Sequence, residues 1–481
     1  MIPLRPRTWL AVCILTAASL LLLALRTAPI GSGLTGLAVI WAAAIPAFVY
    51  LQRVGCDTSP FLAYAGTYYI VFFGLPVFMA PLTFHSGNQT IVYLRAVVGD
   101  LSPAAVGLVA AGVVSMFGGA FFSRDWLFAK FRRFHLGQSP SARQLTLLYL
   151  MLAIAGLIHR LVPAVNNFPS IGQFLDPAGL LGLGGLILQW LRGELTRYEI
   201  AATVIALALA VYVRVYFLFL TDILSALVFV GFIFLRCGRI KILTTLAAVG
   251  VVLVVTYNVI TVGRQSTGGT FADKIRGSAH EIGQMLVEAE TTRPTGSGLW
   301  SGSDPVITYN RRFSNLVHRI GQIWIFQLVF DRTPDPVPYL GGETYRPLLT
   351  AVIPRLIYPD KPQERAGNMF GHRYHLLDPD NETSVNIPWI TELLTNFGPL
   401  SVVLGMGVFG VLLGLLDKFF NQPDMGDMEF IIGLTMIYRL GYQESNFSEM
   451  TGSLPLLFLS LYVYFTVGPK FLERMLRTSQ S

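Results

Sequence analysis

Long runs of apolar residues recur along most of this chain, and short polar stretches separate them. Runs of about 18 residues or more have the length that an α-helix needs to cross a hydrocarbon core of about 30 Å. In lipid every backbone N–H and C=O group must be paired internally, so such runs must be helices. Hydropathy predicts about twelve spans, at residues 9–25, 33–51, 60–82, 103–122, 144–162, 173–191, 199–220, 222–236, 242–262, 394–416, 428–443 and 453–468.

One long polar segment interrupts this pattern. Between Gly263 and Leu393 about 130 residues contain no run long enough to span, which is far beyond an ordinary loop. The chain therefore divides into about nine spans in residues 1–262, the long polar segment in residues 263–393, and about three spans with a basic tail in residues 394–481. The predicted fold class is all-α: a polytopic helical membrane protein with one large extracytoplasmic loop.

Parts of the long polar segment have helical periodicity. Between Arg311 and Phe330, basic and polar residues fall on one face and apolar residues on the other, which predicts an amphipathic helix in the outer membrane–water interface. Residues 332–347 are rich in proline and glycine, so we expect them to be irregular. A short helix is expected from about Pro347, and it must end before Pro354.

Lysine and arginine predict the orientation of the spans. With the N-terminus in the cytoplasm, every short basic loop also falls on the cytoplasmic side, as the positive-inside rule requires. The long polar segment then lies outside, where its own charges do not count because long loops translocate regardless of charge. Both termini are expected in the cytoplasm. The inner basic residues are Arg53, Arg124, Lys130, Arg132, Arg133, Arg143, Arg192, Arg197, Arg236, Arg239, Lys241, Lys418, Lys470, Arg474 and Arg477.

The composition agrees with this interpretation. The chain is 53% hydrophobic and 13% charged, against roughly 25% charged residues in a soluble domain. The net charge is +7, and the positive residues lie between the spans, which favours cytoplasmic anchoring over a nucleic-acid partner. Two arginines before the first apolar run resemble a signal peptide, but the next run follows almost at once, so we expect a retained first span. No disulfide is expected in the long polar segment, because the cysteines are Cys13, Cys56 and Cys237.

Arginine dominates the candidate chemistry of the long polar segment. Its planar guanidinium group binds two phosphate oxygens at once, and several such groups beside an interfacial helix would suit the head of a lipid-linked pyrophosphate. The alternative is that these cations are solvated or pair with the Asp and Glu residues of the segment. The cations are Arg264, Arg276, Arg311, Arg312, Arg319, Arg346, Arg355, Lys361, Arg365 and Arg373.

The stretch from Ile353 to Pro362 holds Arg355 and Lys361 in a stiff backbone. Its three prolines restrict the chain, so both cations would lose little conformational entropy on binding an anion. The alternative is a rigid connector with exposed charges.

A carboxylate follows at the expected return to the membrane. After Pro388, residues 389–397 are expected to begin the tenth span, with Glu392 and Asn396 on one face. Glu392 would lie in the first helical turn, facing outward water, where the helix N-terminus stabilises the anion. It could then accept a proton from a sugar hydroxyl, with His372 as the second candidate. The alternative is a simple helix-start carboxylate.

Two metal signals are weak. His372 and His375 are three residues apart, and Asp378-Pro379-Asp380 is similar to the Asp-x-Asp stretch of metal-dependent glycosyltransferases. Two ligands beside Arg373, with proline in the turn, make a poor metal site. We therefore expect no metal and no other cofactor.

Three charged residues lie in or near predicted spans, where a charge is costly and is usually paired or functional. Arg214 and Asp222 are expected to pair near the outer ends of adjacent helices. Arg439 leads into residues 441–444 at another outer end, close to the candidate site. For each of them, a purely structural role is the alternative.

Several of these features together resemble a known family. They are Arg264 after the ninth span, Arg312, Gly341-Gly342, the Ile353–Pro362 stretch, Gly371, Ser384 and Thr391-Glu392…Asn396-Phe397-Gly398-Pro399. They resemble the Wzy-type O-antigen and exopolysaccharide polymerases, which are polytopic and carry a large periplasmic loop near the C-terminal end. The similarity covers about residues 305–400. Tyr358 stands where the family often has Trp, and Pro399 replaces a more usual second glycine.

The resemblance implies a membrane glycosyltransferase with a GT-C-like architecture. It would join undecaprenyl-pyrophosphate-linked oligosaccharide repeat units at the periplasmic face of the bacterial inner membrane. Its expected partners are that lipid-linked oligosaccharide, membrane lipids, and a chain-length regulator and flippase of the same pathway. On this hypothesis Arg264, Arg312, Arg355, Lys361 and Arg365 bind the pyrophosphate, Arg319, Arg373, Asn396 and Arg439 contact the substrate elsewhere, and Glu392 or His372 takes the hydroxyl proton.

Other functions stay open at this point. A ligase of the O-antigen type, which transfers a finished glycan from the same lipid, would have similar spans and a similar loop, and a lipid-phosphate-sugar transferase is a further enzyme candidate. A flippase or transporter would show polar groups along a central cavity and internal symmetry. The chain has few intramembrane charges and no visible repeat, which favours an enzyme.

Overall fold

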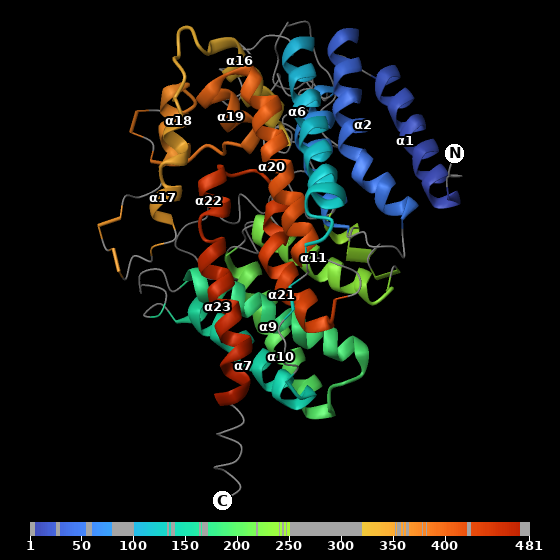
Figure 1. Cartoon of the computed structure of the whole chain (residues 1–481), viewed down its shortest axis with the longest axis vertical. Helices are drawn as coiled ribbons and strands as arrows, with labels where there is room; N and C mark the ends of the chain where they lie inside the picture. The colour runs from blue at the N-terminus through green and yellow to red at the C-terminus, as the bar shows by residue number, and fades with distance from the viewer. Residues whose placement is uncertain are drawn as a thin grey trace, which may run out of the picture.

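The structure is a computed structural model, and it describes residues 5–25, 29–53, 60–78, 101–131, 134–135, 140–162, 165, 172–217, 220–239, 241–242, 245–246, 248–250, 320–351, 353, 357–358, 360–361, 365–377, 379–380, 382–420 and 425–471. Within these ranges every regular element is a helix and no strand occurs (Figure 1). Eight helical segments of the described chain are long and apolar enough to cross a membrane. The described part of the chain is therefore all-helical, with the apolar helices of a membrane-embedded protein.

The first group of helices precedes the long polar segment. It consists of α1 (Pro6–Leu25), α2 (Ile30–Gln52), α3 (Phe61–Tyr69) with the π-helical turn η1 (Ile70–Gly74), α6 (Pro103–Phe122) with the π-helical turn η2 (Ser123–Leu127), α7 (Ala142–Leu161), α9 (Gly172–Arg192), α10 (Arg197–Phe217) and α11 (Leu220–Arg236).

The second group begins inside the long polar segment and continues toward the C-terminus. It consists of α16 (Gln322–Arg332), the 3₁₀ turn η3 (Glu343–Tyr345), α17 (Leu348–Ala351), α18 (Ala366–Arg373), α19 (Trp389–Phe397), α20 (Pro399–Phe420), α21 (Asp427–Ile437), the 3₁₀ turn η4 (Tyr438–Gly441), α22 (Phe447–Thr451) and α23 (Leu454–Thr466). The span expected at 428–443 corresponds to α21, which has 11 residues and is shorter than the roughly 20 needed to cross a bilayer.

Glycines allow α6 and α20 to pack side by side, as Figure 1 shows. A Cβ atom on Gly410 would lie 1.9 Å from the carbonyl oxygen of Met116, and one on Gly414 would lie 2.2 Å from that of Ala120. These two glycines are four residues apart, so they share one face of α20. Small residues in this spacing let two helix backbones approach closely in a membrane.

Gly410→Ala is expected to lower the free energy of unfolding by about 1–3 kcal/mol, the usual cost of overpacking. The added methyl group cannot avoid the Met116 carbonyl unless α6 and α20 move apart. Gly118→Ala on α6 is the matched control, because nothing lies within 4 Å of its added Cβ. Denaturant unfolding in detergent micelles measures both variants, and equal losses would contradict this account of the helix pair.

A second glycine-mediated pair, α7 and α9, brings charged residues together at one end. A Cβ atom on Gly179 would lie 2.8 Å from the Cα atom of Gly156. The two helices are antiparallel, so Arg160 near the end of α7 lies beside Asp176 near the start of α9. The Arg160 Nε atom donates to Asp176 Oδ1 at 2.9 Å.

In the long polar segment, some of the predicted secondary structure is confirmed and some is wrong. The sequence predicts irregular structure for 332–347: residues 333–342 form turns without a regular helix, whereas Arg332 ends α16 and residues 343–345 form the 3₁₀ turn η3. The short helix α17 begins directly after Pro347 and ends at Ala351, before Pro354, as expected. The helices α16, α18 and α19 lie together beside one end of α20 (Figure 1).

The polar face of the amphipathic helix was expected to face water, and for the described part of this helix that expectation is wrong. Gln322, expected on the polar face, is only 3% exposed, because α16 packs against α6, η1 and α19. The neighbouring Gln327 is also buried, and its Oε1 atom accepts a hydrogen bond from the Ser102 backbone N–H at 2.9 Å. Residues 311–319 lie outside the described residues.

The helix α19 covers the predicted residues, but it does not begin a span. Gly398 follows it with a φ of 84°, a conformation that favours glycine, and α20 begins separately at Pro399. The Ser401 Oγ atom donates to the Leu393 carbonyl at 2.8 Å, so the start of α20 packs back onto α19. The spanning helix and the carboxylate of Glu392 therefore belong to different elements.

Candidate functional site

The structure describes only part of the predicted cation set. Arg264, Arg312, Arg319 and Arg355 lie outside the described residues. The structure does not describe the side chains of Arg214 and Asp222 either, so the ion pair expected between them stays a prediction.

Two of the described cations of the long polar segment, Lys361 and Arg373, contact its own backbone. The Lys361 Nζ atom donates to the carbonyl oxygens of Ala351 at 3.2 Å and Ile353 at 3.3 Å, at the end of α17. The Arg373 Nη2 atom donates to the Pro338 carbonyl at 2.7 Å. In this structure both cations contact carbonyl oxygens of the segment, while Arg365 is exposed just before α18.

His372 lies on α18 and is half-buried. Its Nε2 atom is 3.3 Å from the Asn368 Nδ2 atom, which also donates to the Thr383 carbonyl at 2.8 Å. No group of three or more His, Cys, Asp or Glu side chains that could hold a metal ion occurs among the described residues.

The expected exposure of Glu392 to outward water is wrong. Its side chain is 0% exposed, because η3 and α22 enclose α19 at this point. Glu392 Oε1 accepts a hydrogen bond from Thr344 Oγ1 at 2.5 Å, and Oε2 accepts one from the Phe447 backbone N–H at 2.7 Å. The carboxylate therefore connects three segments that are far apart in the sequence.

Asn396 extends the same network, one helical turn after Glu392. Its Nδ2 atom donates to Thr344 Oγ1 at 2.9 Å and to the Glu392 carbonyl at 2.8 Å. Its Oδ1 atom accepts a hydrogen bond from the Gly342 backbone N–H at 2.9 Å. Gly341 and Gly342 have φ angles of 60° and 91°, so the turn needs glycine at both positions. Two of the stretches in which the sequence resembles Wzy-type polymerases, Gly341-Gly342 and 391–399, thus meet at Asn396.

Residues between η4 and α22 complete this site, and the sequence did not single them out as functional. The buried Gln443 accepts a hydrogen bond from the Tyr69 hydroxyl group. The buried Glu444 accepts one from Asn386 Nδ2 at 2.5 Å. The buried Asn446 donates through Nδ2 to Ser448 Oγ at 2.8 Å. We call the set the polar junction: Thr344, Glu392, Asn396, Gln443, Glu444 and Asn446. A possible signal was the run of polar residues at 443–446 inside an apolar region.

One hydroxyl group beside the polar junction has no hydrogen-bond partner within the described part of the chain. The Tyr345 hydroxyl is buried, and its ring is parallel to that of Phe397 at 6.1 Å between centroids. Burial, and to a lesser extent the nearby Glu392 carboxylate, raise the pKa of this hydroxyl. It therefore remains a neutral hydrogen-bond donor beside the carboxylate.

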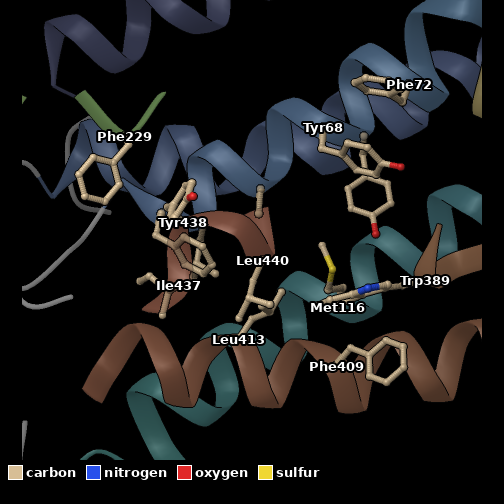
Figure 2. Close-up of a cluster of buried hydrophobic side chains, with 14 of the residues drawn as sticks. Tyr68, Phe72, Met116, Phe229, Trp389, Phe409, Leu413, Ile437, Tyr438 and Leu440 are labelled. Atoms are coloured by element: carbon tan, nitrogen blue, oxygen red, sulfur yellow. The ribbon is translucent and has the colours of Figure 1, made fainter. Parts of the chain in front are cut away.

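A cluster of aromatic side chains packs beside the polar junction. The Phe409 and Phe447 rings stack with centroids 4.3 Å apart, and Trp389 packs edge-on against both. Figure 2 shows Trp389 and Phe409 near Met116, in a cluster of buried hydrophobic side chains that also includes Leu440. In such an apolar environment hydrogen bonds to a carboxylate are stronger than in water.

A small polar pocket of about 20 Å³ is lined in part by η4. Its lining includes Arg160, Asp176, Ser225 and Arg439, which come from α7, α9, α11 and η4. The Arg439 Nε atom donates to the Tyr438 hydroxyl at 3.1 Å. The pocket brings Arg439 together with Arg160, which sequence reasoning missed.

The arrangement can hold the long polar segment firmly against the helix bundle, with a polar pocket next to the contact. Comparisons with known proteins supply no chemistry for it. A family model described as a domain of unknown function (DUF8712) matches residues 134–439. No curated protein and no solved structure matches the chain.

Proposed function

The chain belongs to this DUF8712 family of unknown function, and we propose from its sequence and site that it is a membrane glycosyltransferase. It would join lipid-diphosphate-linked oligosaccharide repeat units on the extracytoplasmic side of a bacterial inner membrane. The proposal includes about twelve spans, a GT-C-like architecture and cytoplasmic termini. A chain-length regulator and a flippase are the partners it implies.

One observation carries the proposal furthest. The Gly341-Gly342 turn and the 391–399 stretch, both part of the resemblance to Wzy-type polymerases, contact each other at Asn396 through the Gly342 N–H at 2.9 Å and the Gly341 N–H at 3.1 Å. Two distant motifs that meet at the buried Asn396 support a shared task. The apolar helices support a substrate that stays in the membrane.

The proposed reaction exchanges one bond to a sugar carbon for another. The bond between the growing glycan's first sugar carbon and the lipid diphosphate breaks, and that carbon bonds to a hydroxyl oxygen of the next lipid-linked unit. The hydroxyl proton goes to a protein base, and the lipid diphosphate leaves with the bonding electrons. A diphosphate needs charge stabilisation more than protonation when it leaves.

The residues have distinct roles in this proposal. The diphosphate cations are Arg264, Arg312, Arg355, Lys361 and Arg365, as the sequence predicts. Glu392 is reassigned to a positioning role, because a base must reach the proton that it removes and this carboxylate is enclosed. His372, half-buried on α18, becomes the candidate base.

Purified protein incubated with lipid-diphosphate oligosaccharide is expected to produce a ladder of glycan lengths. Arg355→Ala or Lys361→Ala should abolish chain growth while the protein still inserts, because each removes a cation from the diphosphate site. Lys470→Ala, an exposed lysine after α23, is the matched control. Full-length polymer from both variants would overturn the assignment, and transfer of a single finished glycan would indicate a ligase instead.

The orientation has its own test. In a variant without Cys13, Cys56 and Cys237, a cysteine introduced by Lys361→Cys should react with a membrane-impermeant thiol reagent added to intact spheroplasts. Labelling only after the membrane is opened from the cytoplasmic side would remove the basis of the extracytoplasmic proposal. Vesicle transport of a labelled lipid-linked sugar without bond formation would favour a flippase.

A further inference from the structure

An apolar pocket lies between the end of α20, the end of α21 and the start of α23, three helices that neighbour one another in Figure 1. Its volume is about 370 Å³, within the range of roughly 300–1,000 Å³ that is typical of sites for small molecules. Every lining residue among those described is apolar, and four are phenylalanines: Phe131, Phe419, Phe420 and Phe458. A polar ligand would leave its hydrogen bonds unmade against these side chains, so the pocket suits a hydrocarbon chain.

The phenylalanines around the pocket pack against one another. The ring centroids of Phe131 and Phe419 are 6.2 Å apart, and those of Phe420 and Phe458 are 5.8 Å apart. Phe134 packs against Phe458 at 5.7 Å, and its backbone N–H donates to the Phe419 carbonyl at 3.0 Å. The connection after η2 is therefore attached to α20, and a ligand would meet a pocket that is already formed, which lowers the cost of binding.

One end of the pocket has the composition of a membrane–water interface. Trp126 is 79% exposed, Leu127 56% and Phe131 52%, and the exposed Lys130 lies between them in the chain. Exposed tryptophan together with lysine anchors proteins at the level of the lipid headgroups. In the orientation that the sequence favours, this is the cytoplasmic surface.

Two lysines directly precede phenylalanines that line the pocket. They are Lys130 before Phe131 and Lys418 before Phe419, and these two rings pack edge to face. Neither lysine has a hydrogen bond or an ion pair within the part of the chain that the structure describes. Because lysine carries its charge on a long flexible stem, both ammonium groups are available to an anionic headgroup at this end of the pocket.

The described acidic residues on η2, α20 and α21 do not compete for these lysines, because each of them contacts another cation. The pairs are Asp125 with Arg53, Asp417 with Arg124, Glu429 with His135, and Asp427 with Arg192 and Arg236. The charge left without a partner near the pocket is therefore positive, and it is complementary to a phosphate group.

We propose that this pocket binds one acyl chain of an anionic phospholipid, whose phosphate group contacts Lys130 and Lys418. The pocket shares no residue with the polar junction. Its first residue on α20, Leu415, lies about 9 Å along that helix beyond Phe409, at about 1.5 Å per residue. The inference therefore goes beyond the proposed function and does not depend on it: the ligand is a lipid of the bilayer, bound at a defined site.

Native mass spectrometry of the full-length protein tests the site. Protein freed of lipid in detergent is titrated separately with phosphatidylglycerol and with zwitterionic phosphatidylcholine of the same acyl chains. The wild-type protein is expected to bind one phosphatidylglycerol at least roughly tenfold more tightly, because each lysine near a membrane surface attracts anionic lipid. Equal affinities would overturn the headgroup assignment, and the absence of a bound lipid would overturn the whole inference.

Two pocket variants separate the chain from the headgroup. Leu416→Trp fills the pocket and should abolish binding of both lipids. Lys130→Gln combined with Lys418→Gln keeps the pocket, so it should lower the affinity for phosphatidylglycerol to that for phosphatidylcholine, and it decides the question even where the filled variant does not fold. Lys470→Gln, an exposed lysine after α23, is the matched control and should change neither affinity. Unchanged binding by a folded Leu416→Trp protein, or by the double lysine variant, would overturn the site.

A competition experiment distinguishes a phospholipid from a prenyl chain. Farnesyl diphosphate added to the complex with phosphatidylglycerol is expected to displace the phospholipid only in large excess. Displacement at a lower concentration than that of the bound phospholipid would assign the pocket to a prenyl chain and would overturn the phospholipid proposal.

Discussion

Replacing Glu392 by alanine is expected to lower the free energy of unfolding by about 3–6 kcal/mol, because hydrogen bonds to a charged group contribute about 1.5–3 kcal/mol each. The Thr344 hydroxyl and the Phe447 N–H both donate to this carboxylate. Without it, two donors are left in an apolar environment, and the contact between η3, α19 and α22 is weakened to the hydrogen bonds that remain, such as that from Ser448 Oγ to the Thr344 carbonyl. Denaturant unfolding in detergent micelles measures the loss.

Glu392→Gln separates the positioning role from a catalytic one. The amide has the same size and keeps one oxygen as an acceptor, so about half of the lost stability should return with part of the polymer ladder. A base at Glu392 would instead give a stable Glu392→Gln protein without any chain growth. That result would restore the original assignment of Glu392 and remove His372 from the proposal.

Replacing Asp417 by alanine is expected to lower the free energy of unfolding by about 3–5 kcal/mol, the usual cost of leaving a buried charge without its partner. Arg124 Nη1 lies 3.0 Å from Asp417 Oδ2, and the two side chains are 4% and 0% exposed. The pair joins η2 to α20, next to the glycine contacts of α6. Thermal unfolding followed by circular dichroism measures the change.

A neighbouring ion pair is the matched control for Asp417. Asp125 contacts Arg53 at 3.3 Å, but these side chains are 36% and 51% exposed. Asp125→Ala should therefore cost no more than about 1 kcal/mol. The double variant Arg124→Leu with Asp417→Leu should recover most of the stability, because it leaves no unpaired charge. An equally unstable double variant would show that packing, not charge, explains the loss.

The sequence predicted local structure in the long polar segment well where the signal was itself local. Proline stops a helix within one or two residues, so the end of α17 before Pro354 followed directly. The start of α19 followed in the same way from Pro388, whereas its end at Phe397 did not, because residues 389–397 were expected to continue into a span. Such predictions need no knowledge of what packs against the element.

The environment of Glu392 could not be predicted in this way. Its hydrogen-bond partners are 48 and 55 residues away in the chain, and helical periodicity assigns a face without saying what covers it. A carboxylate in a first helical turn is exposed by default. Because η3 and α22 pack against α19, Glu392 is buried instead. The burial of Gln322 on α16 could not be predicted for the same reason, since periodicity does not say what packs against a face.

By itself, the sequence determined that this chain is helical and apolar enough for a membrane, because hydropathy and backbone pairing depend only on runs of neighbouring residues. It also showed where polar chemistry interrupts those runs. Tertiary structure decided which polar residues meet: Thr344 with Glu392, Arg160 with the pocket of Arg439, and Gly410 with the backbone of α6. Each of these contacts joins distant segments through packing, which no local pattern encodes.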